Sequence, residues 1–131
     1  MRLNHIAIAV KDLSQAVSIY HNKIGASLGS RHVVESEGIE IAVINLDNTE
    51  IELMMPINNT GGVAKFIEKR GEGLHHICFE IDNIEETIKS LSNSGLKIID
   101  TKPVIGYKGN KAFFVHPSST DGVLLEFYEK R

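Results

Sequence analysis

Two stretches of the chain share one pattern of apolar and polar residues. Residues 3–20 read LNHIAIAVKDLSQAVSIY, and residues 74–91 read LHHICFEIDNIEETIKSL. Each begins with a short apolar run typical of a strand and continues with apolar residues three and four positions apart, the spacing of an amphipathic helix. The copies align at a constant offset, 76 − 5 = 71, so that His5 corresponds to His76. We therefore predict an internal repeat whose copies each begin with a strand and a helix.

Capping signals mark the ends of the two predicted helices. Asp12 and Asn83 are residue types that favour the N-cap, and each is followed three positions later by a Gln or Glu, the spacing of a capping box. Gly25 and Gly95 follow the helical patterns and are expected to end them. The apolar faces are expected to hold Leu13, Ala16, Val17, Tyr20 and Ile24 in the first helix and Ile84, Ile88 and Leu91 in the second.

Strand-like segments follow each helix. In the first copy they lie at about residues 30–35, 39–46 and 50–54, and in the second at about 97–101, 111–116 and 122–128. The segments DNT and PSSTDG are predicted to form the turn before the last strand of each copy. VIGYKGNKA (104–112) contains two glycines and is predicted to be a loop. Each copy therefore reads β-α-β-β-β.

This order predicts the organisation of the whole chain. We expect one α+β domain over residues 1–131, with module one at about 1–56 and module two at about 73–131. The linker, 57–72, holds a short helix at about 63–70. The two modules are expected to form curved mixed sheets around one cleft.

Composition excludes several classes of function. The chain is 42% apolar and 24% charged with a net charge of −3, which gives no indication of a nucleic-acid partner. No apolar run approaches the roughly 20 residues of a membrane helix, and the N-terminus lacks the apolar core of a signal peptide. The single cysteine, Cys78, excludes a disulfide scaffold and a cysteine-rich zinc site. We therefore expect a cytoplasmic protein.

The adjacent histidines, His75 and His76, cannot share a role. Neighbouring side chains of a strand point to opposite faces. His76 repeats His5, whereas His75 points the other way and is expected to be packed or half-exposed.

A glutamate recurs in the last strand of each module. Glu52 and Glu126 each lie between apolar neighbours, and their offset, 126 − 52 = 74, is close to that of the histidines. A glutamate in such a strand faces either solvent or a cleft. Since two histidines and two glutamates recur in the first and last strands of two copies, the repeat favours a shared site.

The chain resembles the vicinal oxygen chelate superfamily, which includes glyoxalases and bleomycin resistance proteins. GLHHICFEIDNI, GYKGNKAFFVHPSSTDGVLLEF and NTEIELMMP resemble methylmalonyl-CoA epimerases, and NHIAIAVKDL…IYHNKIG also resembles bacterial glyoxalase I. The resemblance implies that His5, Glu52, His76 and Glu126 bind one metal ion. It also implies a homodimer. Many epimerases carry either Gln or Glu at the position of Glu52, so this residue does not separate the two families.

Two histidines and two carboxylates form a site suited to Ni²⁺ or Co²⁺, with Zn²⁺ or Mn²⁺ as further options. Four protein ligands leave two positions of an octahedron for substrate. The metal then acts as a Lewis acid that stabilises the enediolate formed when a neighbouring C–H proton leaves.

Three functions are compatible with this chemistry. The first is a methylmalonyl-CoA epimerase, which moves a proton alpha to a thioester carbonyl. The second is glyoxalase I (lactoylglutathione lyase), which converts the hemithioacetal of methylglyoxal and a thiol to a lactoyl thioester. The third is a binding protein of the same fold without turnover, although such proteins usually lack the full ligand set.

Further residues are candidates for the reaction or for substrate binding. The resemblance implies that Glu126 acts as a base, and an epimerase needs a second base for the opposite side, for which Glu40 is the candidate. Glu40 is otherwise a solvated edge residue. The phosphates of a CoA substrate could meet Lys108 and Lys111 or the linker-helix cations, and Met54 could line an acyl pocket; otherwise these are surface and core residues. The cations of the linker helix are Lys65, Lys69 and Arg70.

Overall fold

The computed structural model describes residues 1–100, 102–106 and 108–130. The chain forms two compact units. The first unit is His5–His75, and the second unit is His76–Arg131 together with Met1–Asn4. Each unit holds nearly all of one predicted module, and the linker belongs to the first.

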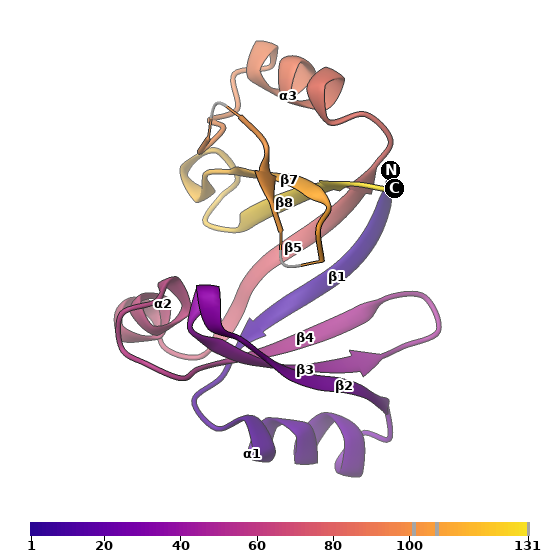
Figure 1. The fold of residues 1–131 in the computed structure, drawn as a ribbon, viewed down its shortest axis with the longest axis vertical. Helices are drawn as coiled ribbons and strands as arrows, with labels where there is room; N and C mark the ends of the chain where they lie inside the picture. The colour runs from indigo at the N-terminus through magenta and orange to yellow at the C-terminus, as the bar shows by residue number, and fades with distance from the viewer. Residues whose placement is uncertain (101, 107, 131) are drawn as a thin grey trace. The chain divides into compact units, whose positions relative to one another are not determined.

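The first unit contains most of strand β1, strands β2 to β4 and helices α1 and α2 (Figure 1). Its sheet has the order β2-β3-β4-β1, in which β1 and β4 are parallel and the other pairs antiparallel. The bounds are β1 Arg2–Ala9, α1 Leu13–Val17, β2 Ser27–Val34, β3 Ile39–Asn45, β4 Glu50–Pro56 and α2 Gly62–Arg70. A π-helical segment, Ser18–Lys23, extends α1, and a 3-10 turn, Glu35–Glu37, precedes β3.

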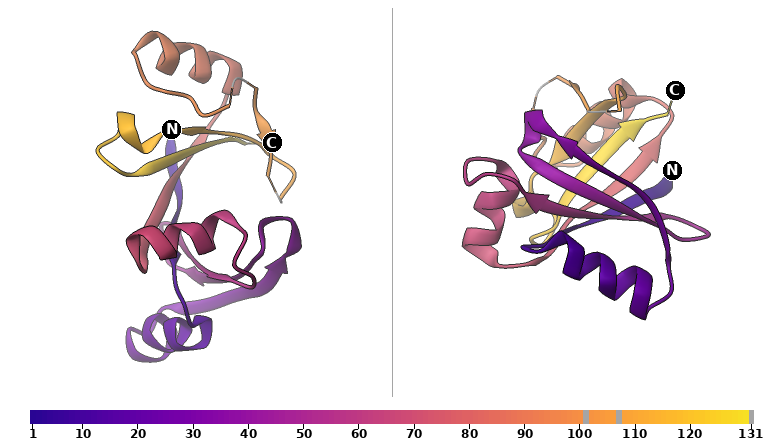
Figure 2. Two further views of the ribbon diagram at one scale, coloured as in Figure 1. Left: turned by 90° about the vertical axis from the view of Figure 1, so that its left-hand side faces the viewer. Right: turned by 60° about the horizontal axis from the view of Figure 1, so that its bottom comes forward.

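The second unit contains most of strand β5, strands β6 to β8 and helix α3, and α3 covers one face of the β7–β8 ribbon (Figure 2). The strand order is β5-β8-β7-β6, with β5 and β8 parallel. The bounds are β5 Gly73–Ile81, α3 Ile84–Asn93, β6 Val104–Ile105, β7 Lys111–Val115 and β8 Leu124–Glu129, with a 3-10 turn at Pro117–Ser119. Both units follow the predicted β-α-β-β-β order, and the α+β class is confirmed.

Alternation along β3 separates the two faces of the first sheet. Ile39, Ile41 and Val43 pack toward α2, whereas Ala42 and Ile44 pack toward α1. The two helices therefore lie on opposite faces of this sheet (Figures 1 and 2). Burial of apolar side chains on both faces is the main force that holds the unit together.

The core of the second unit is aromatic. The ring of Phe127 lies 5.0 Å from that of Phe113 and 5.4 Å from that of Phe79, measured between centroids. Ile84, Ile88 and Leu91 of α3 pack against this cluster, as the helical spacing predicts.

The predicted helix signals are confirmed. Asp12 Oδ1 accepts a hydrogen bond from the backbone N of Gln15, and Asn83 Oδ1 accepts one from the backbone N of Glu86, each at 3.0 Å. Gly25 and Gly95 adopt φ of +90° and +87°, which favour glycine after a helix.

Two details of the prediction are wrong. Ile24 is 65% exposed, because the π-helical segment changes the spacing that would have aligned it with the buried face. In the second unit, Ile98 makes only an isolated bridge with Val115, and the regular strand is β6, inside the predicted loop 104–112. The pairing register with β7 shifts between Ile98 and Val104. Thr101, at the end of the predicted strand, lies outside the described residues.

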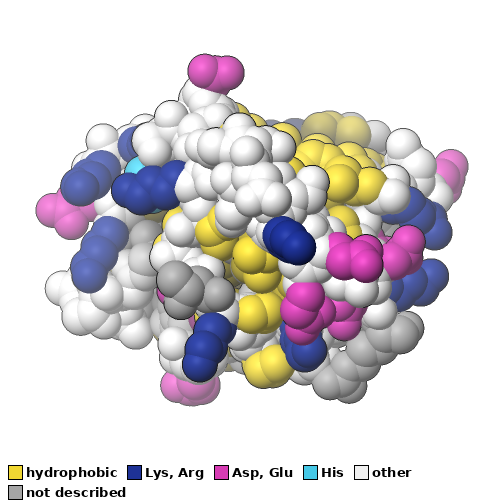
Figure 3. Space-filling view, turned by 90° about the horizontal axis from the view of Figure 1, so that it is seen from above, with side chains coloured by type: hydrophobic (Ala, Val, Ile, Leu, Met, Phe, Trp, Pro, Cys, Tyr) yellow, Lys and Arg dark blue, Asp and Glu magenta, His cyan; other side chains and the backbone are white. Residues whose placement is uncertain are grey.

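Within the described ranges, no helix is long and apolar enough to cross a membrane. Figure 3 shows acidic, basic and hydrophobic side chains together on the surface seen from above.

Candidate metal centre

The first unit holds a buried histidine–glutamate pair. In the parallel ladder of β1 and β4, His5 lies opposite Glu50 and Ala7 lies opposite Glu52, so His5 and Glu52 are diagonal neighbours on one face. The distance from His5 Nε2 to Glu52 Oε2 is 3.4 Å, and the two side chains are 9% and 4% exposed.

The second unit repeats this arrangement. In the ladder of β5 and β8, His76 lies opposite Leu124 and Cys78 lies opposite Glu126. His76 Nε2 is 3.1 Å from Glu126 Oε2, with the side chains 9% and 18% exposed. The sequence predicts that first and last strands can be neighbours, and in each unit they are.

The faces of the strands explain why these glutamates are not simply solvated. Glu52 lies opposite Val43, on the face that packs toward α2, while its neighbour Leu53 packs toward α1. Glu126 lies opposite Phe114, whereas Phe127 belongs to the core beneath α3. Each glutamate therefore faces away from its apolar neighbours, as predicted, and is nonetheless shielded from water.

The donor set fits a divalent metal ion. Burying a carboxylate is costly unless a cation or several hydrogen bonds compensate its charge. One imidazole accompanies each carboxylate, and imidazole nitrogen with carboxylate oxygen is a ligand combination of Ni²⁺, Co²⁺, Zn²⁺ and Mn²⁺. His5, Glu52 and His76 are among the residues whose chemistry and burial could hold a metal ion.

The neighbouring histidines have the expected separate roles. His75 is half-buried, and its ring centroid lies 4.8 Å from that of Phe66, so it packs away from the face of His76. His116 accepts a hydrogen bond from the backbone N of Ser118 through Nδ1 at 3.0 Å. It thus caps the 3-10 turn at Pro117–Ser119.

Glu40 does not share the face of the ligands. Its Oε2 accepts a hydrogen bond from Arg31 Nε at 2.9 Å, and Arg31 Nη1 donates one to Ser14 Oγ on α1 at 3.3 Å. Because Glu40 alternates with the α2-facing residues of β3, it lies on the face opposite Glu52. The hypothesis that Glu40 serves as a second base lacks this geometric basis, since its carboxylate is engaged beside α1.

The substrate candidates lie in different environments. Met54 is buried in the core beneath α2, on the same face as Glu52. Lys111 Nζ lies 3.3 Å from Glu85 Oε1 of α3, so it occupies the α3 face rather than that of Glu126. Lys108 is exposed in the loop before β7. Substrate binding by these three residues stays a prediction.

Sequence reasoning missed a polar network beside the second pair. The Tyr128 hydroxyl donates to Glu80 Oε2 at 3.1 Å, and Asn4 Nδ2 donates to the Tyr128 hydroxyl oxygen at 3.3 Å. Tyr128 lies two positions after Glu126, on the same face of β8. Alternation along this strand was the available signal, because residues 124, 126 and 128 share one side.

A model of the glyoxalase/bleomycin resistance protein/dioxygenase superfamily matches residues 4–114. The chain belongs to this superfamily. The predicted resemblance is thereby confirmed, and the His–Glu pairs lie in the strands from which the resemblance draws its ligand set.

Several similar proteins are named as epimerases. The chain is 37% identical over 126 residues to the mitochondrial methylmalonyl-CoA epimerase of Bos taurus, covering 95% of this chain and 72% of that one. It is 38% identical over 127 residues to the ethylmalonyl-CoA/methylmalonyl-CoA epimerase of Cereibacter sphaeroides, covering 95% of both. A solved variant of Streptomyces coelicolor methylmalonyl-CoA epimerase in complex with 2-nitronate-propionyl-CoA is similar with a TM-score of 0.88, 27% identity, and coverage of 99% and 94%.

The likeness to glyoxalase I is more distant. The lactoylglutathione lyase of Schizosaccharomyces pombe is 26% identical over 113 residues, covering 72% of this chain and 37% of that one. The comparisons therefore support an epimerase-type enzyme acting on a small-molecule thioester.

Proposed function

We propose that this protein is a metal-dependent epimerase that inverts the carbon alpha to the thioester of methylmalonyl-CoA or a closely related acyl-CoA. The observation that carries the proposal is the pair of histidine–glutamate motifs in identical register in the two units. Relatives that span nearly the whole chain and bear the name of this activity support the choice of reaction.

The proposed ligands are His5, Glu52, His76 and Glu126, binding one divalent ion, with Ni²⁺ or Co²⁺ preferred and Zn²⁺ or Mn²⁺ as alternatives. When bound, the ion supplies Lewis-acid stabilisation of negative charge on substrate oxygen. The protein supplies four buried or half-buried donors on regular strands, which hold their positions better than loop residues would.

Glu126 is proposed to carry the proton. Its side chain is 18% exposed, compared with 4% for Glu52, so it is the more accessible carboxylate. The carboxylate takes the C2 proton, the electron pair of the C–H bond moves toward the thioester carbonyl, and an enolate results. Return of a proton to the opposite side inverts the carbon. His76 Nε2 lies 3.1 Å from Glu126 Oε2, a spacing that suits two donors to one ion.

Inversion needs a second proton-transfer group on the opposite side of the planar enolate. Glu40 is engaged with Arg31 on the α1 face, so we do not assign this role to it. A titratable side chain on the same sheet face as Glu52 or Glu126 could serve as this second proton-transfer group.

Glyoxalase I is the second candidate, because one displaceable carboxylate can move a proton between adjacent carbons on one side. The His and Glu ligand set suits both reactions equally, but this chain matches only 37% of the length of the lactoylglutathione lyase of Schizosaccharomyces pombe. A non-catalytic binding protein of the same fold is third. The homodimer and the cytoplasmic location stay predictions from the sequence.

A paired assay tests the proposal. The nickel- or cobalt-loaded protein is incubated with methylmalonyl-CoA in deuterated water, and in parallel with methylglyoxal and glutathione. Epimerase function predicts deuterium at C2 together with inversion, and no lactoyl thioester. Formation of lactoyl thioester without exchange at C2 would establish the glyoxalase reaction instead.

A further inference from the structure

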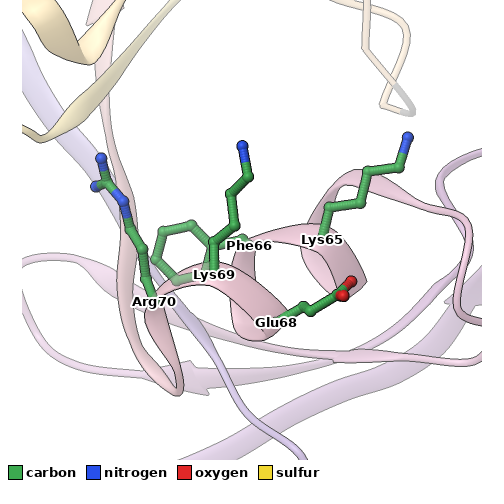
Figure 4. Close-up of a pocket in the computed structure, with 5 residues that line it drawn as sticks. All are labelled: Lys65, Phe66, Glu68, Lys69 and Arg70. Atoms are coloured by element: carbon green, nitrogen blue, oxygen red, sulfur yellow. The ribbon is translucent and has the colours of Figure 1, made fainter.

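Helix α2 lies in the linker, outside both copies of the repeat. A pocket with a volume of about 430 Å³ runs along it, lined by Lys65, Phe66, Glu68, Lys69 and Arg70 (Figure 4). This volume lies within the range of small-molecule sites. The repeat explains the metal ligands but not this pocket, so its composition calls for a separate explanation.

The pocket is basic. Three of its five lining residues are cationic and one is acidic, and the three cationic side chains extend to the same side of the helix (Figure 4). The helix dipole accounts for Lys69 and Arg70, which lie in the last turn. It does not account for Lys65, one turn earlier, which forms an unfavourable like-charge pair with Lys69 at the i, i+4 spacing. Such an arrangement is understandable if an anion binds between the two ammonium groups.

Phe66 supplies a flat surface beside these charges. Its ring is half-buried, the Arg70 guanidinium carbon lies 5.9 Å from its centroid, and His75 packs at 4.8 Å. An aromatic ring adjoining a guanidinium is suited to stacking a nucleobase and binding its phosphate.

The position of α2 relates this pocket to the His5–Glu52 pair. Phe66, Ile67 and Val63 pack against Ala9 and Met54, on the sheet face that also carries Glu52. From His5 to Ala9 the strand advances four residues, or about 13 Å. A substrate with its reactive group at the pair would therefore need a long arm to reach α2.

We propose that this pocket binds the nucleotide end of the acyl-CoA substrate, with the phosphates at Lys65, Lys69 and Arg70 and the adenine beside Phe66. The proposal rests on the proposed function, since it places the tail of the same substrate. It identifies α2 as the element that selects CoA thioesters over shorter thioesters.

A surface on α3 provides a matched control. A pocket of about 450 Å³ there is lined by Glu86, Lys89, Ser90, Asn93 and Ser94. Its charges balance and its lining includes no aromatic residue. Lys89→Glu therefore reverses an exposed helical lysine without changing the pocket on α2.

The test compares two substrates. For Lys65→Glu/Lys69→Glu, we expect the KM for methylmalonyl-CoA to rise roughly tenfold, a fold-change typical of about 1.4 kcal/mol, with kcat nearly unchanged. The KM for methylmalonyl-pantetheine, which lacks the nucleotide, should stay as in the unchanged protein. Lys89→Glu should alter neither value.

A binding measurement separates this inference from the proposed function. Calorimetry with adenosine 3′,5′-bisphosphate needs no turnover, and the double variant should bind it roughly tenfold more weakly than the unchanged protein. Equal binding by the two proteins, or equal KM values for methylmalonyl-CoA, would overturn the inference. If neither thioester is turned over but the bisphosphate binds as described, the pocket stands and the proposed epimerase activity fails.

Discussion

The two modules hold the same histidine–glutamate pair in the same ladder register, yet the pairs have different surroundings. In module one the residue opposite the glutamate is Ala7, and in module two it is Cys78. Glu52 is 4% exposed at its side chain and Glu126 is 18% exposed. The duplicated backbone thus fixes where the donors lie, while unduplicated neighbours decide how accessible each donor is.

Under the proposed function, this difference suggests that both glutamates bind the metal but that only one of them transfers the proton. In the proposed site, each module contributes one histidine and one glutamate to metal binding. Proton transfer needs a carboxylate that can reach the substrate, and that favours the more exposed one. Comparing equivalent substitutions in the two modules should therefore show equal effects on metal binding and unequal effects on chemistry.

The largest expected effect comes from the histidines. His5→Ala and His76→Ala should each abolish stoichiometric metal binding and reduce turnover by about 10²-fold or more, because each removes one of the two proposed nitrogen donors. Elemental analysis of the purified protein and the epimerase assay measure the two effects.

His75→Ala is the matched control. It removes an imidazole that packs on Phe66, so metal content should stay near that of the unchanged protein. Loss of metal in His75→Ala with retention in His76→Ala would mean that the functional side of β5 is the other one.

The next effect should separate the two carboxylates. Glu126→Gln should lower turnover roughly 10²–10⁴-fold, the usual contribution of a general base, because an amide cannot accept the C2 proton. Glu52→Gln should cost roughly tenfold at most, since glutamine can still offer an oxygen donor.

Deuterium exchange at C2 reports proton transfer directly, and metal content is measured in the same samples. If both variants kept their metal and lost turnover equally, the assignment of proton transfer to Glu126 alone would be wrong.

A smaller effect is expected for Glu40→Gln. Its ion pair with Arg31 is partly exposed, so loss of the pair should cost about 0.2–1 kcal/mol of unfolding free energy. Turnover should stay within about twofold, because the carboxylate lies on the face opposite Glu52. Urea unfolding and the epimerase assay test the two statements. A large loss of turnover in a protein that keeps its metal would restore Glu40 as the second base.

Much of the fold could be predicted from local sequence signals that occur in both modules. The N-caps at Asp12 and Asn83, the buried helix faces and the order of strands all depend on residues close in sequence, and they are confirmed. The parallel neighbours β1 and β4 could be anticipated because the repeat places a histidine and a glutamate at matching ends of each module.

The errors share a physical cause, which is that backbone irregularities shift a register without changing the residue pattern. The π-helical segment moves Ile24 to the surface, and the break after Ile98 moves the regular strand to Val104–Ile105. The sequence also does not determine on which face of the sheet Glu40 lies. Both faces of β3 are apolar, so alternation alone does not say which face carries the ligands.

The smallest effect concerns Glu85, whose counterpart at the 71-residue offset is Ser14. In the first turn of α3, a backbone hydrogen bond and then Lys111 lower the pKa of Glu85 below its ordinary value of 4.5. A lowered folded-state pKa stabilises the protein above about pH 4.5, and this contribution disappears as the pH falls through the folded value. Glu85→Gln should therefore slightly lower the urea midpoint at neutral pH, and the difference from the unchanged protein should vanish in strong acid. Ser14→Ala, which has no titrating group, should give a difference independent of pH across this range. A Glu85→Gln difference that persisted in acid would mean that side-chain packing, and not the charge of Glu85, stabilises the start of α3.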